Sequence, residues 1–152
     1  MSPMVIDAVF AFVHFLGIGS LVAVLAMQTA ALRDQPTPTA IEYLNKIDMG
    51  LGISALVILL AGAGRVVWGL KGADYYMGNT VFWVKIALFF AAGLASVPPT
   101  LAFIAWRKGL KANAAFRPTA EALARVRMHI KAQWLLLVLI PLAAVLMARD
   151  LP

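Results

Sequence analysis

The chain has 152 residues, of which 62% are hydrophobic and only 13% are charged. A water-soluble domain of this composition would expose far too much apolar surface, so the sequence predicts an integral membrane protein. The chain contains no cysteine, which excludes disulfides, thiolate metal sites, iron–sulfur ligation and a cysteine nucleophile. Alternating strand-length segments with glycine-rich turns are missing. This excludes a membrane barrel and leaves an all-α fold.

The first predicted span covers about residues 4–32. It begins without the basic segment of a secretory signal, so we expect a retained helix. Asp7, His14, Leu21 and Gln28 recur within it every seven residues. This spacing puts the four side chains near one stripe of the helix, and we expect that stripe to face the other helices.

The second predicted span covers about residues 49–70, but its helix begins earlier. Thr39 and Glu42 stand at capping-box spacing after a polar break, which predicts a helix start there. The first two turns, with Asp48, are expected at or outside the membrane surface. Small residues often let transmembrane helices approach closely, so we predict helix contacts at six glycines of the first two helices. They are Gly17, Gly19, Gly50, Gly52, Gly62 and Gly64.

The third predicted span covers about residues 80–106 and contains Pro98 and Pro99. Each proline removes a helical hydrogen bond, so we expect a kink near residues 94–96. The fourth span covers about residues 130–148, and its helix is expected to start at Pro118 with a basic, amphipathic segment. Residues 1–152 are therefore predicted to form a single transmembrane domain, a four-helix bundle.

Basic residues predict the orientation of this bundle. Nine of the 13 Lys and Arg residues fall in the first and third connections or in the helix starts beside them. The positive-inside rule places those connections in the cytoplasm, with both termini outside and helices two and four extended into the cytoplasm. The expected location is the bacterial cytoplasmic (inner) membrane. The charge attracts anionic membrane lipid, and nothing else in the sequence supports nucleic-acid binding.

The segment from Arg65 to Lys85 carries the strongest functional signal. Ionisable side chains within a membrane are costly and usually face a partner or a cavity, so both residues are candidates for catalysis or binding. Between them, Tyr75, Tyr76 and Trp83 suit either a membrane interface or the rim of a cofactor pocket. The alternative for Lys85 is a structural role, in which its ammonium snorkels to the outer surface.

His14 is the candidate metal ligand. It is expected roughly 15 Å below the membrane surface, near the bilayer centre, at 1.5 Å of rise per residue. One imidazole in a membrane bundle can ligate haem iron while basic groups pair with the propionates. His129 is expected at the cytoplasmic start of the fourth helix, too far away to share that haem. The alternative is that His14 only makes a hydrogen bond to a neighbouring helix.

The run GADYYMGNTVFWVK, the later SVPPTL and the helix around His14 resemble a family of small bacterial four-helix membrane proteins of unknown function. More distantly, the chain is similar to the HemJ type of protoporphyrinogen oxidase. That family has four spans, a histidine in its first helix and a lysine early in its third, which His14 and Lys85 match by position. It has Trp-Phe-Ala-Gly after its histidine, where this chain has FLGIGS. The resemblance implies haem b bound through His14, with a porphyrin as substrate and a membrane acceptor such as a quinone.

Three hypotheses about function stay open. The first is a haem-b-binding membrane oxidoreductase. The second is a non-enzymatic accessory subunit, whose glycine-rich faces dock on a larger membrane complex or on another copy of the chain. The third is a small transporter in which Lys85 and Arg65 bind an anion. A hydrolase is not supported, because the sequence has no nucleophile elbow, no HExxH and no phosphate-binding glycine loop.

Overall fold

The computed structural model describes residues 2–149, so Met1 and residues 150–152 of the predicted domain lie outside the described residues. The chain forms five helices within that range. Each of the four long ones is long and apolar enough to cross a membrane, which confirms the predicted all-α fold with four spans. The helices are α1 (Pro3–Ala31), α2 (Pro38–Trp68), α3 (Gly72–Met77), α4 (Thr80–Ala112) and α5 (Ala120–Ala148).

Threonine caps fix the starts of α2 and α5, at positions that differ from the prediction. The hydroxyl of Thr37 accepts a hydrogen bond from the N–H of Ala40, and Pro38 fills the first helical position. Helix α2 therefore begins before the predicted start at Thr39. Thr119 caps α5 in the same way, so Pro118 precedes that helix instead of opening it.

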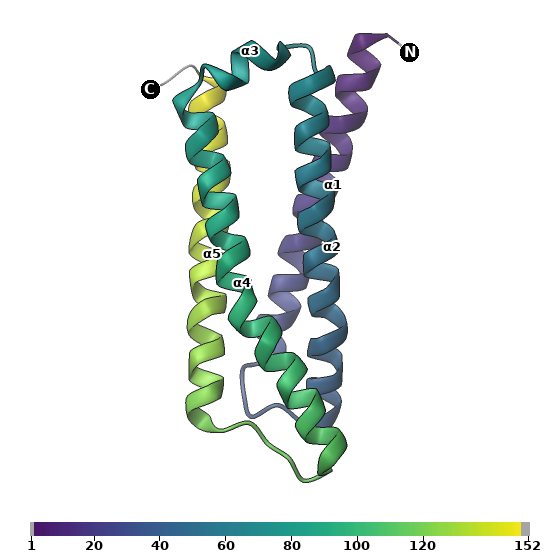
Figure 1. Ribbon diagram of the computed structural model, residues 1–152, viewed down its shortest axis with the longest axis vertical. Coiled ribbons are helices and arrows are strands. Elements are labelled where there is room, and N and C mark those ends of the chain that lie inside the picture. The colour runs from purple at the N-terminus through teal and green to yellow at the C-terminus, as the bar shows by residue number, and fades with distance from the viewer. Residues whose placement is uncertain (1, 150–152) are drawn as a thin grey trace.

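A short helix, α3, lies in the connection between α2 and α4, where the sequence analysis predicts no element. Gly72 has a φ of 75°, a backbone conformation that glycine adopts without steric cost, and it lets the chain turn after α2. The side chain of Asn79 then caps α4 by accepting a hydrogen bond from the N–H of Phe82. We call this end of the molecule the α3 end (Figure 1).

The four long helices form two antiparallel hairpins, α1 with α2 and α4 with α5 (Figure 1). The hairpins are apart at the α3 end and come together at the opposite end, which we call the basic end, where α4 crosses α2. The larger core cluster lies toward the basic end and combines side chains from all four long helices. Its buried members are Leu25, Leu32, Ile41, Leu44, Leu51, Phe103, Trp106, Leu123, Val126 and Ile130.

A second, smaller cluster at the α3 end contains Tyr76, Phe82 and Met147. It joins α3, α4 and α5 and includes no buried side chain of α1. The two hairpins are therefore packed together mainly at the basic end, while their halves at the α3 end are held by separate contacts.

Helix α4 continues as one helix through Pro98 and Pro99 and slants across the bundle from α5 toward α2 (Figure 1). The hydroxyls of Ser96 and Thr100 donate back to carbonyls of the preceding turn, at 2.6 and 3.1 Å. The prolines thus lie within a helix that is not interrupted, and the local kink stays a prediction.

Candidate functional site

His14 is half-buried on α1 and faces α2. Its Nδ1 lies 3.0 Å from the carbonyl oxygen of Ile58. Because a carbonyl only accepts hydrogen bonds, Nδ1 carries the proton, and the neutral ring keeps a lone pair on Nε2. The ring lies against Gly62, where a Cβ atom would be 3.4 Å from Cε1 of His14, an ordinary van der Waals distance. Helix α2 thus orients the imidazole and leaves one nitrogen for a ligand.

Arg65 lies in the last turn of α2 and faces α1. Its Nε is 3.8 Å from Oδ1 of Asp7, which is within ion-pair range but too long for a hydrogen bond. This Nε is buried and has no hydrogen-bond acceptor among the described residues. A buried donor without an acceptor carries a desolvation penalty. The side chain of Arg65 as a whole is 33% exposed, so part of it remains accessible beside its ion pair with Asp7.

Lys85 approaches the same region from α4. Its ammonium lies 5.5 Å from the ring centroid of Phe82, a cation–π contact. In the described part of the chain, no carboxylate lies within ion-pair distance of Lys85. The charges of Arg65 and Lys85 both act on His14, and the charge of Arg65 acts on Lys85. No hydrogen bond or ion pair among residues 2–149 joins Lys85 to His14 or to Arg65.

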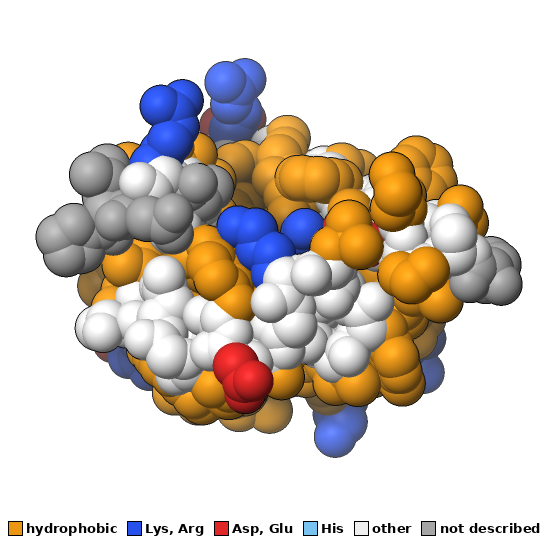
Figure 2. All heavy atoms as spheres, turned by 90° about the horizontal axis from the view of Figure 1, so that it is seen from above, with side chains coloured by type: hydrophobic (Ala, Val, Ile, Leu, Met, Phe, Trp, Pro, Cys, Tyr) orange, Lys and Arg blue, Asp and Glu red, His pale blue; other side chains and the backbone are white. Residues whose placement is uncertain are grey.

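Figure 2 looks directly onto the α3 end. Lys or Arg side-chain atoms lie at the middle of this face, between two groups of hydrophobic side chains. Arg65 comes to this end from one hairpin and Lys85 from the other. The α3 end therefore combines cationic groups with an apolar surrounding, which suits an amphipathic ligand that carries carboxylates.

The predicted tyrosines are held by contacts around α3. The hydroxyl of Tyr75 donates to the carbonyl oxygen of Met147 at 3.2 Å and accepts from Nζ of Lys71 at 3.0 Å. Tyr76 is buried, with its ring centroid 5.5 Å from that of Phe82. The tyrosines thus connect α3 to α4 and α5.

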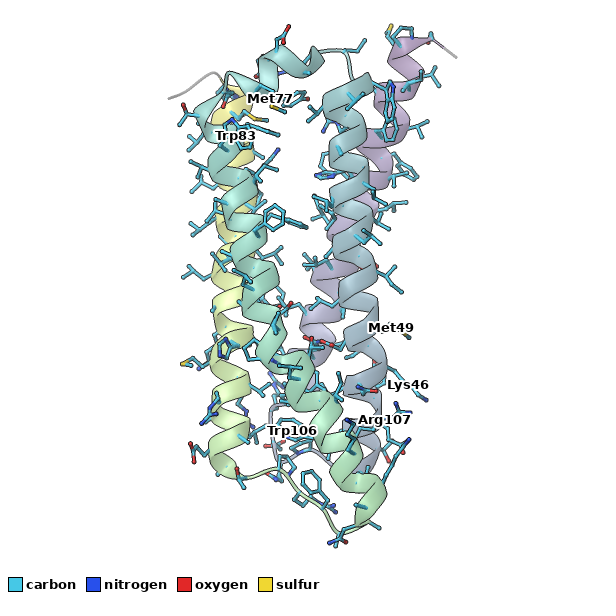
Figure 3. The ribbon with its side chains drawn as sticks, in the orientation of Figure 1. Lys46, Met49, Met77, Trp83, Trp106 and Arg107 are labelled. Atoms are coloured by element: carbon cyan, nitrogen blue, oxygen red, sulfur yellow. The ribbon has the colours of Figure 1, made fainter. Side chains whose placement is uncertain are left out.

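Trp83, the third predicted aromatic residue, is 51% exposed on α4. Its indole Nε1 donates to the carbonyl oxygen of Met77 at 3.1 Å, and the two residues lie together at the α3 end in Figure 3. An exposed tryptophan with a satisfied N–H is typical of the membrane interface. Its role at the rim of a cofactor site stays a prediction.

A buried polar cluster lies nearer the basic end, and the sequence analysis does not include it among the candidates. Nε2 of Gln28 donates to Oδ1 of Asp48 at 2.9 Å, and the two residues are only 0% and 9% exposed. Thr100 of α4 also interacts with the carboxyl of Asp48. Gln133 of α5 is buried too, and its Nε2 has no partner among the described residues. Asp48 is therefore enclosed by the bundle, and its expected place near the membrane surface does not leave it solvated.

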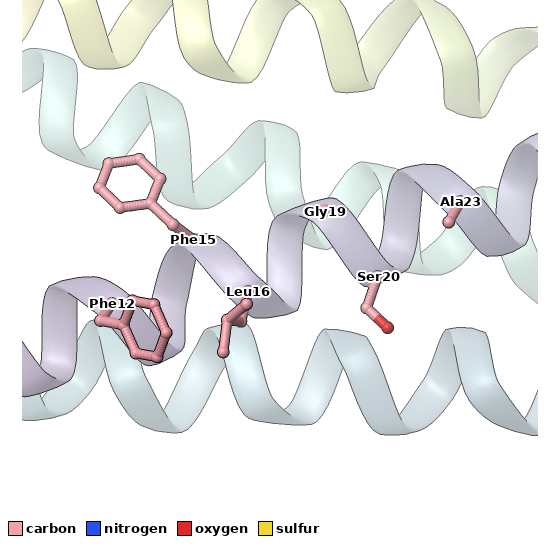
Figure 4. Close-up of a pocket in the computed structure, with 6 residues that line it drawn as sticks. All are labelled: Phe12, Phe15, Leu16, Gly19, Ser20 and Ala23. Carbon is pink, nitrogen blue, oxygen red and sulfur yellow. The ribbon is translucent and has the colours of Figure 1, made fainter.

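An open, mostly apolar hollow of about 520 Å³ lies on the outer face of α1 (Figure 4). Gly19 lies in its floor with open space around it, so the prediction that this glycine packs against a helix is wrong for the contacts within the chain. Gly17 behaves as predicted, because a Cβ atom there would lie 2.8 Å from Cγ1 of Ile58. The hollow is lined by Phe12, Phe15, Leu16, Gly19, Ser20 and Ala23.

Residues 2–149 contain no group of three or more His, Asp or Glu side chains that is placed to hold a metal ion. His14 is a single candidate ligand. Metal bound to it would have to bring further ligands of its own, as haem iron does with its porphyrin nitrogens.

No curated protein and no solved structure matches this chain. A family model described as a predicted membrane protein (DUF2214) matches residues 6–151, a range that includes His14, Arg65 and Lys85. This match confirms the resemblance to a membrane family of unknown function, while the relation to the HemJ type stays a prediction. The chain belongs to the DUF2214 family of predicted membrane proteins.

Proposed function

We propose that this protein is a haem-b-binding oxidoreductase of the bacterial cytoplasmic membrane, similar to the HemJ type of protoporphyrinogen oxidase. The observation that carries the proposal is the hydrogen bond between Nδ1 of His14 and the carbonyl of Ile58. Metal-ligating histidines commonly donate their second ring N–H in this way, because the bond fixes both tautomer and ring orientation. Nε2 of His14 would then be the atom that holds the haem iron.

The cationic residues at the α3 end fit the carboxylates of such a group. The side chain of Arg65 is 33% exposed and only loosely paired with Asp7, and Lys85 has no carboxylate partner in the described part of the chain. Both would bind propionates, of the haem or of a porphyrin substrate, through charge-assisted hydrogen bonds. Asp7 holds Arg65 toward α1, the helix that also carries His14. Tyr75, Tyr76 and Trp83 would flank the entrance at this end.

A bound haem would supply a one-electron redox centre, which the side chains of this bundle do not offer. Oxidation of a porphyrinogen to a porphyrin proceeds by successive two-electron steps that also release two protons each, and at each step a membrane quinone reduced to its quinol would take up both the electrons and the protons. Arg65 and Lys85 would orient the carboxylates of the substrate, while the surrounding apolar side chains would keep water from its ring.

We also propose an orientation for the bundle. The basic end would face the cytoplasm, since nine of the 13 Lys and Arg residues belong to its connections and the adjoining helix ends. The α3 end and both termini would then lie on the outer side, and α2 and α5 would extend beyond the membrane at the cytoplasmic side.

Binding and transport of a small anion is the second candidate function. The partly exposed side chain of Arg65 favours it, as does the ammonium of Lys85, which has no carboxylate partner among residues 2–149. This function needs the two cations but gives no role to Nε2 of His14. It therefore predicts that His14 can be replaced without loss of binding.

The absorption spectrum of the purified protein tests the proposal. After expression with added haem precursor, the wild type should show a Soret band. His14→Ala should lose the band, while His129→Ala, on α5, should keep it. Circular dichroism should show equal helix content in all three proteins. A wild type without a Soret band, or a His14→Ala variant that retains it, would overturn the assignment of His14 as haem ligand.

A further inference from the structure

A second hollow, remote from the α3 end, is bordered by three cationic side chains, an asparagine and an isoleucine, and the apolar stems of these side chains form much of its wall. It lies between α2 and α4 near the basic end and has a volume of about 140 Å³. Pockets that enclose drug-sized ligands measure about 300–1,000 Å³, so this hollow suits only a small group such as a phosphate. Its lining residues are Asn45, Ile104, Arg107, Lys108 and Lys111.

The charges around this pocket form no ion pair within residues 2–149. Arg107 donates from Nη1 to Oδ1 of Asn45 at 3.1 Å, a bond that holds the guanidinium at the wall between α2 and α4. None of Arg107, Lys108 and Lys111 is paired with a carboxylate in the described part of the chain. Three cations around one hollow repel one another, so a bound anion would relieve that repulsion.

The surface that leads from the pocket toward the middle of the bundle is apolar. On α2 the apolar side chains that come after Asn45 at helical spacing are exposed, and on α4 those that come before Ile104 are exposed as well. Gly52 has open space around it. Figure 3 shows Met49 on the same side of the bundle as Lys46 and Arg107. The exposed residues of this apolar strip are Met49 and Leu56 on α2, and Val97 and Leu101 on α4.

We propose that this pocket binds the headgroup phosphate of an anionic phospholipid, whose acyl chain lies along the apolar strip. Basic pockets between transmembrane helices are a recognised way to hold such headgroups. A free phosphate would use the cations but leave the strip unexplained, whereas a phospholipid uses both. The lipid touches α2 and α4 where the two hairpins meet, so it stabilises the crossing of these helices.

Thermal unfolding in a neutral detergent tests this assignment. Added phosphatidylglycerol should raise the unfolding midpoint of the wild type, whereas phosphatidylcholine and inorganic phosphate should leave it unchanged. The double variant Arg107→Gln, Lys108→Gln should bind phosphatidylglycerol more weakly, by about fivefold for each charge removed. The double variant Arg33→Gln, Lys131→Gln removes the same charge from exposed positions outside the pocket and should respond like the wild type.

A single variant, Lys111→Glu, keeps the test valid if the double variant does not fold. Lys111 is exposed and makes no ion pair with a described carboxylate, so the change should leave the fold intact and still weaken phosphatidylglycerol binding. Equal losses in the pocket and control variants would show a general attraction to basic surface and overturn the proposal. A full response to inorganic phosphate would overturn the lipid as ligand.

Discussion

Gln28 on α1 donates a hydrogen bond of 2.9 Å to the carboxyl of Asp48 on α2, in the half of the bundle where all four long helices meet. Both residues are buried. No Lys, Arg or His of the described chain lies within ion-pair distance of Asp48. The carboxyl therefore depends on neutral donors, of which the amide of Gln28 is one.

Replacing Gln28 by leucine should destabilise the fold, because it removes a donor from a buried carboxyl. We expect a loss of about 1–3 kcal/mol in the free energy of unfolding, the usual cost of leaving a buried polar group unsatisfied. Unfolding in mixed detergent micelles, followed by circular dichroism, measures it. The double variant Gln28→Leu, Asp48→Leu should be more stable than Gln28→Leu alone. A double variant that is no more stable would contradict this dependence.

Gly64 is expected to be a sensitive contact between α1 and α2. A Cβ atom at Gly64 would overlap the ring of Phe10, which stacks on Trp68 with centroids 5.7 Å apart. Gly64→Ala should therefore force the ring aside and cost about 1–3 kcal/mol of stability, as overpacking usually does. Gly52→Ala is the matched control, because open space surrounds that position. Equal unfolding midpoints for the two variants would show that Phe10 adapts without cost.

The sequence is sufficient for the four spans, because their length and apolar content are set by the thickness of the bilayer. The order of the spans also places Arg65 and Lys85 toward the same end of the bundle. In an antiparallel bundle the order of the helices fixes which residues share a depth.

The prediction from the sequence places Asp48 at the membrane surface, although the spacing of its apolar neighbours indicates that it is buried. Ile41, Leu44, Asp48 and Leu51 follow one another at steps of three or four residues, so Asp48 lies on an apolar stripe. Its neighbours on that stripe are core residues. A single polar residue on an apolar stripe is expected to be buried with a hydrogen-bond partner. Asp48 is instead predicted to be solvated when it is treated as one of several charged residues in the start of the helix.

The separation of the hairpins at the α3 end cannot be read from the sequence in the same way. In a membrane protein, side chains that face lipid are as apolar as those that face another helix, so hydrophobicity does not distinguish the two. Gly19 shows the same ambiguity, since a glycine can mark either a helix contact or an open surface. In the structure Gly19 lies on an open surface, while Gly17, two residues earlier, packs closely on Ile58.

The proposed orientation can be checked by cysteine labelling, since the chain has no cysteine of its own. Ala73 is exposed in α3, and Ala114 is exposed in the connection between α4 and α5. With the basic end in the cytoplasm, a membrane-impermeant maleimide added to intact cells should label Ala73→Cys but not Ala114→Cys. Labelling of both after lysis shows that each thiol is reactive. Labelling of Ala114→Cys alone in intact cells would reverse the orientation.

Lys85→Met should weaken binding at the α3 end without changing the fold. The substitution keeps the apolar stem and deletes only the charge, so insertion and helix packing should persist. If the ammonium binds a propionate, loss of that charge-assisted hydrogen bond should cost about 1–3 kcal/mol of binding free energy. Titration of the purified protein with haem, followed by absorbance, measures the change.

Lys71→Met provides the matched control for this change. Lys71 also lies at the α3 end, but it is exposed, and it is not among the charges that act on His14. Its replacement should leave haem affinity close to that of the wild type. A lysine that only snorkels to the surface already has its ammonium in water and lipid headgroups, so its loss would cost almost nothing. Equal affinities for Lys85→Met, Lys71→Met and the wild type would therefore assign Lys85 a structural role and leave Arg65 as the remaining candidate for propionate binding.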